Sequence, residues 1–250
     1  MHVSVLSRYP FKSFQGEVLD RVELDAKGVP GDRRWALVDR TTGKTLSAKR
    51  EPRLLDAAAR TTADGHVVVS LPDGSEHDTA DPALAAAAER WLGRPVTVAS
   101  ADESAGVFEF NISSEDDDSP MVDVPCPPGT FLDLAAVHIL TTASLRAIAA
   151  SHPEGRWEAP RFRPTILVEA DEEGFVEDAW IGRQVVIGGA VMEPFMPTVR
   201  CAMTTRPQLD LPRDLDIAKT VNREHGGSLG IYCTVTRPGP VSVGDTVSLR

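Results

Sequence analysis

Cysteine is scarce in this 250-residue sequence, and so is net positive charge. The three cysteines, Cys126, Cys201 and Cys233, are too few and too scattered for a disulfide framework, and no two of them form a C-x-x-C pair. The formal charge of -11 argues against a general nucleic-acid binder, because affinity for phosphate backbones comes largely from clusters of Lys and Arg. We therefore expect reduced thiols and no nucleic-acid partner.

Long hydrophobic runs are also missing. No apolar run approaches the roughly 20 residues that a membrane-spanning helix needs, and the N-terminus lacks the charged and apolar regions of a signal peptide. We therefore expect no membrane partner and a cytoplasmic location. The sequence also contains no G-x-G-x-x-G or G-x-x-x-x-G-K-[ST] phosphate loop and no internal repeat.

Short strands and turns dominate what is present. Strands are predicted where apolar and polar residues alternate or β-branched residues gather, over residues 2–7, 18–24, 66–71 and 229–236. Helices are predicted at 81–93, where Asp81 is a good N-cap and Pro82 suits the first helical position, at 141–150 and at about 213–223.

This pattern predicts an α+β fold that is mainly β, with two β-barrel-like domains and a few short helices. We place the domains at residues 1–102 and 103–250. The stretch from 102 to 120 is rich in Ser, Asp and Glu and includes the acidic run 115–118, which is typical of a solvated loop near a boundary.

Cys201 is the candidate reactive residue. It directly follows Arg200 and lies between an apolar, strand-like run and a Thr-rich segment. A thiolate is a soft donor that suits a soft or borderline metal, and a neighbouring guanidinium stabilises the ionised thiol. A lone cysteine is more often a small buried hydrophobe, so the residue types alone leave both interpretations open.

Three segments place cations where they can bind an anion. They are Lys12 with Ser13 on a turn, Arg33 with Arg34 after a glycine loop, and Arg161 with Arg163 at the start of a predicted strand over 161–168. Alternate residues of a strand point to one face, so Arg161 and Arg163 would lie together. Solvated turns and an exposed strand edge are the plain alternatives.

His138 lies on an apolar strand candidate over residues 131–140 and is interpreted as a hydrogen-bonded core residue. A cysteine hydrolase with His138 or His225 as base has no support from the spacing.

Six segments occur in order along almost the whole chain. They are Tyr-Pro-Phe-Lys-Ser from Tyr9, Gly-Asp-Arg-Arg-Trp from Gly31, Arg-Phe-Arg-Pro-Thr from Arg161, Arg-Cys-Ala-Met-Thr-Thr from Arg200, Leu-Gly-Ile-Tyr from Leu229 and Pro-Gly-Pro-Val-Ser-Val-Gly-Asp from Pro238. Together they resemble the MOSC superfamily. More narrowly, they resemble the branch with an N-terminal MOSC β-barrel domain, which includes the mitochondrial amidoxime-reducing component and bacterial relatives.

The resemblance implies a molybdenum cofactor, a pterin dithiolene that carries a phosphate, with Cys201 as the single protein ligand of the metal. Family positions that hold the cofactor fall on Lys12, Ser13, Arg33 and Arg163. Thr165 stands where the family usually has Asn, so one donor amide is lost there. Arg200 and Tyr232 are expected to shape the pocket. The domain also carries a general association with pyridoxal phosphate binding.

The implied reaction is the reduction of N-hydroxylated compounds such as amidoximes, hydroxylamines and N-hydroxylated bases. This sequence has no C-x4-C-x2-C pattern, so a separate flavin or iron-sulfur protein is the expected electron donor. Two alternatives stay open: a sulfur carrier or cofactor-delivery protein with a persulfide on Cys201, and a non-catalytic binding barrel.

Overall fold

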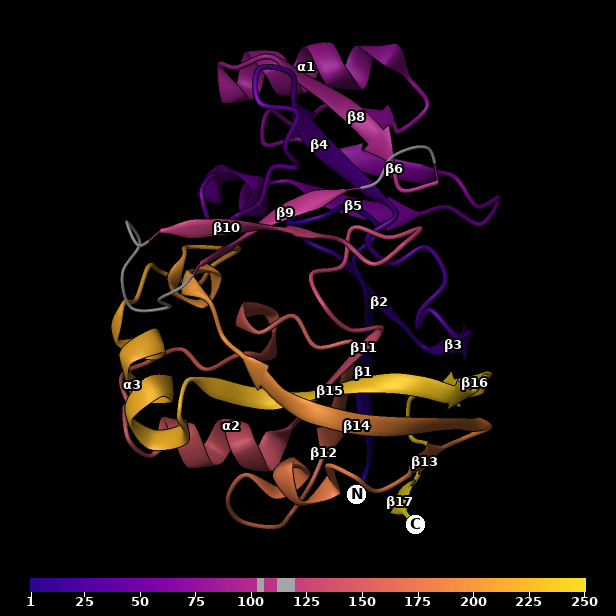
Figure 1. The fold of residues 1–250 in the computed structure, drawn as a ribbon, viewed down its shortest axis with the longest axis vertical. Helices are drawn as coiled ribbons and strands as arrows, with labels where there is room; N and C mark the ends of the chain where they lie inside the picture. The colour runs from indigo at the N-terminus through magenta and orange to yellow at the C-terminus, as the bar shows by residue number, and fades with distance from the viewer. Residues whose placement is uncertain (103–105, 112–119) are drawn as a thin grey trace.

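The computed structural model describes residues 1–102, 106–111 and 120–250. Two parts lie one above the other along the long axis (Figure 1), with helix α1 (Pro82–Leu92) at the top and helices α2 (Thr142–Ala149) and α3 (Asp216–His225) in the lower part. Both chain ends lie in the lower part. The predicted α+β fold, mainly β, is confirmed.

The lower part is built on an eight-stranded sheet with the order β17-β13-β14-β15-β11-β12-β1-β2. The strands are β1 (His2–Arg8), β2 (Glu17–Leu19), β11 (Val137–Thr141), β12 (Ile166–Glu169), β13 (Val185–Ile187), β14 (Ala190–Val199), β15 (Ser228–Arg237) and β17 (Val247–Leu249). One face of these strands forms a dry core of mostly aliphatic side chains. Strands β14 and β15 are the longest of these, and β14 leads the chain to Cys201.

The N-terminal segment begins in this sheet, because β1 pairs antiparallel with β12. Strand β3 (Arg21–Leu24) pairs with β16 (Gly239–Ser242) in a separate two-stranded sheet. The chain therefore starts in the lower part before it enters the upper one. The division predicted at residue 102 stays a prediction.

The upper part consists of small sheets and α1. The pairs are β4 (Trp35–Asp39) with β8 (Val96–Ser100) and β9 (Val107–Asn111) with β10 (Met121–Pro125); β5 (Ala58–Thr61), β6 (Val67–Ser70) and β7 (Glu76–Asp78) form a third sheet. Its core is separate from that of the lower sheet and contains Phe11, Phe14 and the inner face of α1. Strands β9 and β10 run between the two parts in Figure 1.

The helix signals of the sequence are confirmed. The Asp81 side chain accepts a hydrogen bond from the Ala83 N–H, and Gly93 ends α1 in the left-handed conformation. Thr141 caps α2 by accepting from the Ser144 N–H. The third helix begins at Asp216, three residues later than predicted.

Three strand predictions are corrected. Arg161 ends a short 3-10 helix, η2 (Ala159–Arg161), and the strand starts only at Ile166, because Pro164 has no N–H to pair. Residues 131–136 are bends and irregular segments, so the strand around His138 covers only 137–141. The stretch 18–24 is divided at Asp20 into β2 and β3, which pair with different partners. The acidic run 115–118 lies outside the described residues.

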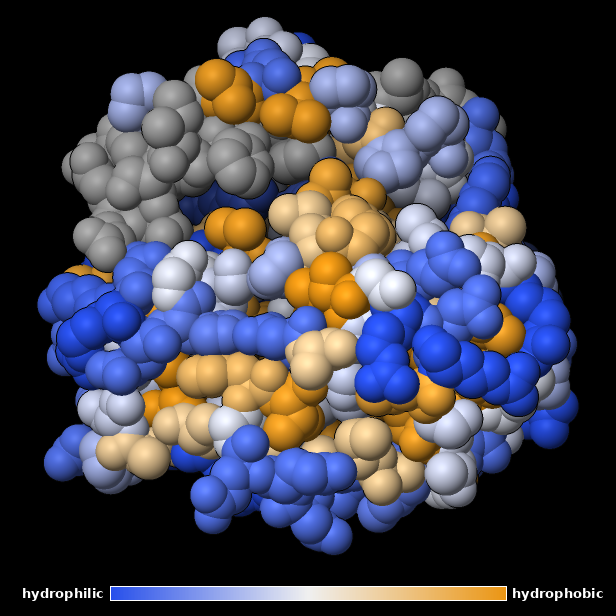
Figure 2. Space-filling view, turned by 60° about the horizontal axis from the view of Figure 1, so that its bottom comes forward, coloured by the Kyte–Doolittle hydropathy of each residue, from blue (hydrophilic) through white to orange (hydrophobic). Residues whose placement is uncertain are grey.

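Hydrophobic side chains also reach the surface. Figure 2 shows orange, hydrophobic residues along the middle of one face, among blue hydrophilic ones. The exposed large hydrophobic residues of the described chain include Leu134, Phe195 and Val199. Single exposed apolar residues are normal, so only their position relative to a site gives them meaning.

Candidate functional site

A cavity of about 430 Å³ is lined by both parts of the molecule. All eight predicted site residues line it: Lys12, Ser13, Arg33, Arg163, Thr165, Arg200, Cys201 and Tyr232. The first three come from loops of the N-terminal half. Arg163 and Thr165 precede β12, Arg200 and Cys201 follow β14, and Tyr232 lies within β15. Residues up to 220 positions apart in the sequence therefore share one site.

Backbone strain is concentrated at this cavity. Among the described residues other than glycine, a positive φ occurs at Ser13 (67°), Arg33 (46°), Arg163 (52°) and Leu209 (52°), and the first three line the cavity. Such a conformation costs of order 1–3 kcal/mol per residue and persists only where surrounding contacts enforce it. At Ser13, for example, the hydroxyl accepts a hydrogen bond from the Ala48 N–H at 3.0 Å. The strain indicates that the directions of these side chains matter.

Arg163 is a buried cation without an acidic partner among the residues that the structure describes. Its Nη1 donates to the Phe14 carbonyl at 2.7 Å, and its guanidinium lies 4.0 Å from the centre of the Tyr9 ring. It forms no ion pair with a described carboxylate, and Nη2 is buried without a hydrogen-bond partner. Burial, and then the charge of Arg33, lower the pKa of Arg163 to about 10. This site would be stabilised by an anion.

Arg33 also contacts the Tyr9 ring that Arg163 contacts. Its guanidinium lies 4.4 Å from the ring centre and also pairs with the Asp32 carboxylate. Asp32 in turn accepts the Tyr9 N–H at 2.7 Å. Cation–π contacts and this ion pair hold two like charges close together, which a bound anion would favour further.

Arg200 is the second buried cation without a described carboxylate. Its Nη2 donates to the Phe162 carbonyl at 2.8 Å, its guanidinium lies 5.4 Å from the Phe162 ring centre, and Nε has no partner among the described residues. Burial lowers the pKa of Arg200, while the neighbouring Tyr232 and Cys201 act in the opposite direction. The guanidinium therefore lies where negative charge on Cys201 would be stabilised.

Two lysines and one aspartate form an ion cluster at the same wall. The Asp133 carboxylate accepts from Lys12 and, at 2.9 Å, from Lys49, and Lys12 also donates to the Phe131 carbonyl at 2.6 Å. Burial alone would raise the pKa of Asp133, but the two ammonium groups outweigh it, so the pKa lies well below its usual value. Burial would lower the pKa of Lys49, yet Asp133 keeps it above its ordinary value. Asp133 and Lys49 therefore stay charged near neutral pH.

Cys201 lies immediately after β14 and precedes the 3-10 helix η4 (Ala202–Thr205). Its carbonyl accepts from the Thr204 N–H at 3.2 Å and from the Thr204 hydroxyl at 3.1 Å. The side chain is half-buried, lines the cavity and is not part of a disulfide. The thiol is thus open to a ligand in the cavity, on a turn whose backbone is fixed.

Two family models together match most of the chain. The MOSC domain model matches residues 128–248, and the model of the MOSC N-terminal beta barrel domain matches residues 1–111. The chain belongs to the MOSC superfamily. The resemblance seen in the six sequence motifs is confirmed at this level, and the narrower comparison with the mitochondrial amidoxime-reducing component stays a prediction.

One solved structure supports the fold, and a second is reported as a partial match. The chain is similar to the YuaD protein from Bacillus subtilis, at 14% identity and a TM-score of 0.51, over 99% of this chain and 94% of that one. It is also similar to YiiM from Geobacillus stearothermophilus, at 18% identity and a TM-score of 0.37, over 46% of this chain and 54% of the other. No curated protein matches the chain.

Arg161 holds the Cys201 loop of this MOSC chain in place. The side chain is fully buried and donates to the carbonyls of Arg156 at 2.6 Å, Thr204 at 3.2 Å, Arg206 at 3.4 Å and Pro212 at 2.8 Å. The sequence-based pairing of Arg161 with Arg163 on one strand face is therefore wrong. Carbonyl oxygens of two loop segments, and not an anion, satisfy this guanidinium.

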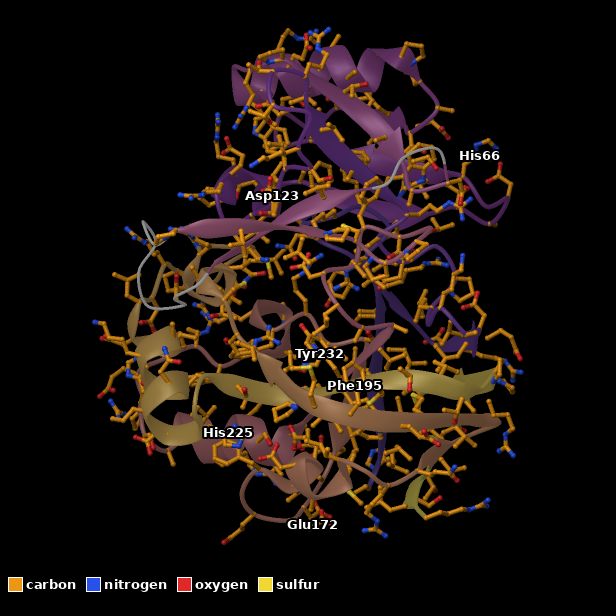
Figure 3. All side chains as sticks on the ribbon, viewed as in Figure 1. His66, Asp123, Glu172, Phe195, His225 and Tyr232 are labelled. Atoms are coloured by element: carbon orange, nitrogen blue, oxygen red, sulfur yellow. The ribbon has the colours of Figure 1, made fainter. Side chains whose placement is uncertain are left out.

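His138 and Tyr232 complete the floor near Thr165. The Thr165 hydroxyl accepts the His138 N–H at 3.2 Å, and the His138 ring meets the Tyr232 ring edge-on at 5.8 Å between centres. Figure 3 shows Tyr232 among the central strands. Burial and then Arg200 hold the pKa of His138 well below its usual value, so the imidazole is neutral. The prediction of a buried histidine is confirmed, but this one also lines the cavity.

The sequence interpretation missed Lys49 and Asp133 as site residues, and it assigned Arg161 to an anion where the structure pairs it with carbonyl oxygens. A signal existed for Asp133, which is a single carboxylate inside the otherwise apolar run 131–137. A charge in such a run is usually paired or functional. Lys49 had no comparable signal, since only folding brings it to Asp133.

Two further findings concern the described residues only. No helix in them is long and apolar enough to cross a membrane, and no group of three or more His, Cys, Asp or Glu side chains in them is placed to hold a metal ion. The comparisons give no support to pyridoxal phosphate binding.

Proposed function

We propose that this protein binds a molybdenum cofactor through Cys201 and reduces N-hydroxylated compounds with electrons from a separate donor protein. The observation that carries the proposal is the pair of buried guanidiniums, Arg163 and Arg200, that lack a described carboxylate and line one cavity with a half-buried thiol. A buried charge without a partner is costly, so the arrangement favours an anionic ligand with a soft centre.

The residues present fit such a group. Lys12, Arg33 and Arg163 would hold its phosphate, because cations and hydrogen-bond donors on one wall suit an anion. Ser13 faces the same cavity, although its hydroxyl already accepts from Ala48. Thr165 stands where the family usually has Asn, and its hydroxyl already accepts a hydrogen bond from the backbone N–H of His138. This part of the cavity wall therefore makes its hydrogen bond within the protein. Cys201 would supply the soft ligand.

The bound cofactor would supply two-electron chemistry, as cofactors do in such enzymes, while the protein positions the reactants. The overall change consumes two electrons and two protons: the N–O bond breaks, the nitrogen gains one proton, and the hydroxyl oxygen takes the other and leaves as water. Arg200 would stabilise the thiolate, and the neutral His138 adds no positive charge beside it. The raised pKa of Tyr232, caused mainly by burial, keeps its hydroxyl protonated in the cavity wall.

The electrons are proposed to come from a separate flavin or iron-sulfur protein. Cys201 lies in a cavity that opens at its rim to exposed side chains such as Val199, so a donor can approach this side of the molecule.

The first test is molybdenum content by mass spectrometry after expression in a host that makes the cofactor. We expect near-stoichiometric metal in the native chain and in Cys126→Ala, and a loss of most of it in Cys201→Ala. Cys126 is the matched control because it is also half-buried but does not line the cavity. The native protein should then reduce benzamidoxime to benzamidine with a chemical reductant; a loaded protein that reduces no N-hydroxylated compound would refute the activity.

A sulfur carrier is the second candidate. The supporting observation is that Cys201 is free, half-buried and next to a buried cation, as a persulfide anion would require. This function predicts a chain without metal in both cysteine variants and in the native protein, with sulfane sulfur that cyanide removes from Cys201 as thiocyanate.

A further inference from the structure

The cavity is divided chemically between floor and entrance. The cations Arg163 and Arg200 are 5% and 8% exposed, whereas two apolar side chains of the same cavity, Leu134 and Val199, are 51% and 50% exposed. The cations therefore lie deep, and apolar surface lies where solvent reaches the cavity. The Asp133 side chain is also exposed there, at 39%, but its charge is paired with the buried Lys12 and Lys49. Val124, Met196 and Met203, which are partly exposed, also line it.

The thiol is flanked by apolar residues along the chain. Val199 precedes Cys201 by two residues, and Met203 follows it by two. In an extended segment, alternate side chains point to opposite sides, so Val199 and Cys201 share a side while Arg200 turns inward to Phe162. A molecule that reaches the sulfur from solvent thus passes apolar surface first.

Apolar surface at the rim of a polar cavity gains free energy when a ligand covers it and removes it from water. An anion on the floor would satisfy the guanidiniums but leave Leu134 and Val199 in water. We propose that these two residues, with Met203, form an apolar entrance that selects substrates whose N-hydroxy group is attached to an uncharged apolar body, such as an aryl or alkyl group. Small polar N-hydroxylated bases are disfavoured, and so are cationic compounds.

This inference rests on the proposed function for the identity of the substrate, but the entrance can be tested without turnover. The probes are methanethiosulfonates that carry a benzyl, a sulfonatoethyl or a trimethylammonioethyl tail and react with Cys201. The full chain, with the substitution Cys126→Ala, is expressed in a host that lacks the cofactor. Cys233 is buried, so Cys201 is the cysteine that the reagents can reach. Rates are divided by those of free cysteine, and mass spectrometry checks that Cys201 is the labelled residue.

We expect the benzyl reagent to react at least about tenfold faster than the trimethylammonioethyl one after this correction. Val199→Ser and Leu134→Ser should each reduce the benzyl rate by about fourfold, the factor for roughly one buried methylene, and leave the sulfonatoethyl rate unchanged. Val243→Ser is the control, because Val243 is 44% exposed but lies outside the cavity. If the benzyl reagent reacts at the same rate in Val199→Ser, Leu134→Ser and the unsubstituted protein, the proposal of an apolar entrance is refuted.

Turnover by the loaded protein separates the two claims. If benzamidoxime is reduced, Val199→Ser should raise its KM about fourfold with kcat retained, and a polar N-hydroxylated base should be unaffected; an equal effect on both substrates would overturn the inference. If no N-hydroxylated compound is reduced while the benzyl preference stands, the reductase proposal fails and the apolar entrance is retained.

Discussion

Replacement of Arg161 by Met tests whether a buried arginine positions the Cys201 loop. Methionine occupies a similar length without donors, so the carbonyls of Arg156, Thr204 and Pro212 lose their partners. The two shortest contacts, at 2.6 and 2.8 Å, come from a charged donor, and such hydrogen bonds contribute about 1.5–3 kcal/mol each. Removing a guanidinium that is fully buried offsets part of this loss.

The net destabilisation should be about 3 kcal/mol, which corresponds to a drop in Tm of roughly 6–12 °C for a chain of this size. Differential scanning calorimetry and urea unfolding measure it. Arg161→Lys should restore part of the stability, because an ammonium can donate to some of the same carbonyls. Loosening of η4 should also raise the alkylation rate of Cys201 well below the unfolding temperature, which a purely global loss of stability would not do.

The matched control is Arg146→Met. Arg146 also donates to backbone carbonyls, of Ala170 at 2.6 Å and Glu172 at 3.1 Å, but it is exposed and distant from the cavity in the fold. We expect a loss of about 1 kcal/mol or less and no change at Cys201. If Arg161→Met melts within about 2 °C of the native protein and Cys201 reacts at the native rate, the positioning role is refuted.

Two further predictions concern charge. The pKa of His138 is lowered well below 6.5 in the folded state, so its stabilising contribution is present above pH 6.5 and is lost as the pH falls toward the folded pKa. In chemical unfolding, the native protein should therefore lose more stability between pH 6.5 and 5 than His138→Gln does. Asp133→Asn removes the carboxylate that both Lys12 and Lys49 contact, so Tm should fall by several degrees and recover with added inorganic phosphate more than the Tm of the native protein rises. If added phosphate does not change the Tm of Asp133→Asn, the prediction of an anion site at this wall is contradicted.

Local signals in the sequence were sufficient for the helices. Asp81, Thr141 and Gly93 act on groups within four residues, so the caps of α1 and α2 could be predicted from neighbours alone. The strands were less certain: the stretch 18–24 looks like one strand, but Asp20 divides it because β2 pairs with β1 and β3 with β16. Pairing partners distant in sequence decide where a strand ends.

The sequence by itself determined the superfamily, the mainly β fold and the residue types of the candidate site, because motifs such as Arg200-Cys201 are local. Only the tertiary structure decided how they combine. It separated Arg161, bound to carbonyls, from Arg163, bound at the cavity, although the two lie two residues apart. It also brought Lys49 to Asp133, 84 residues away, because a charge buried on folding must meet its partner in space, and no local pattern records that distance.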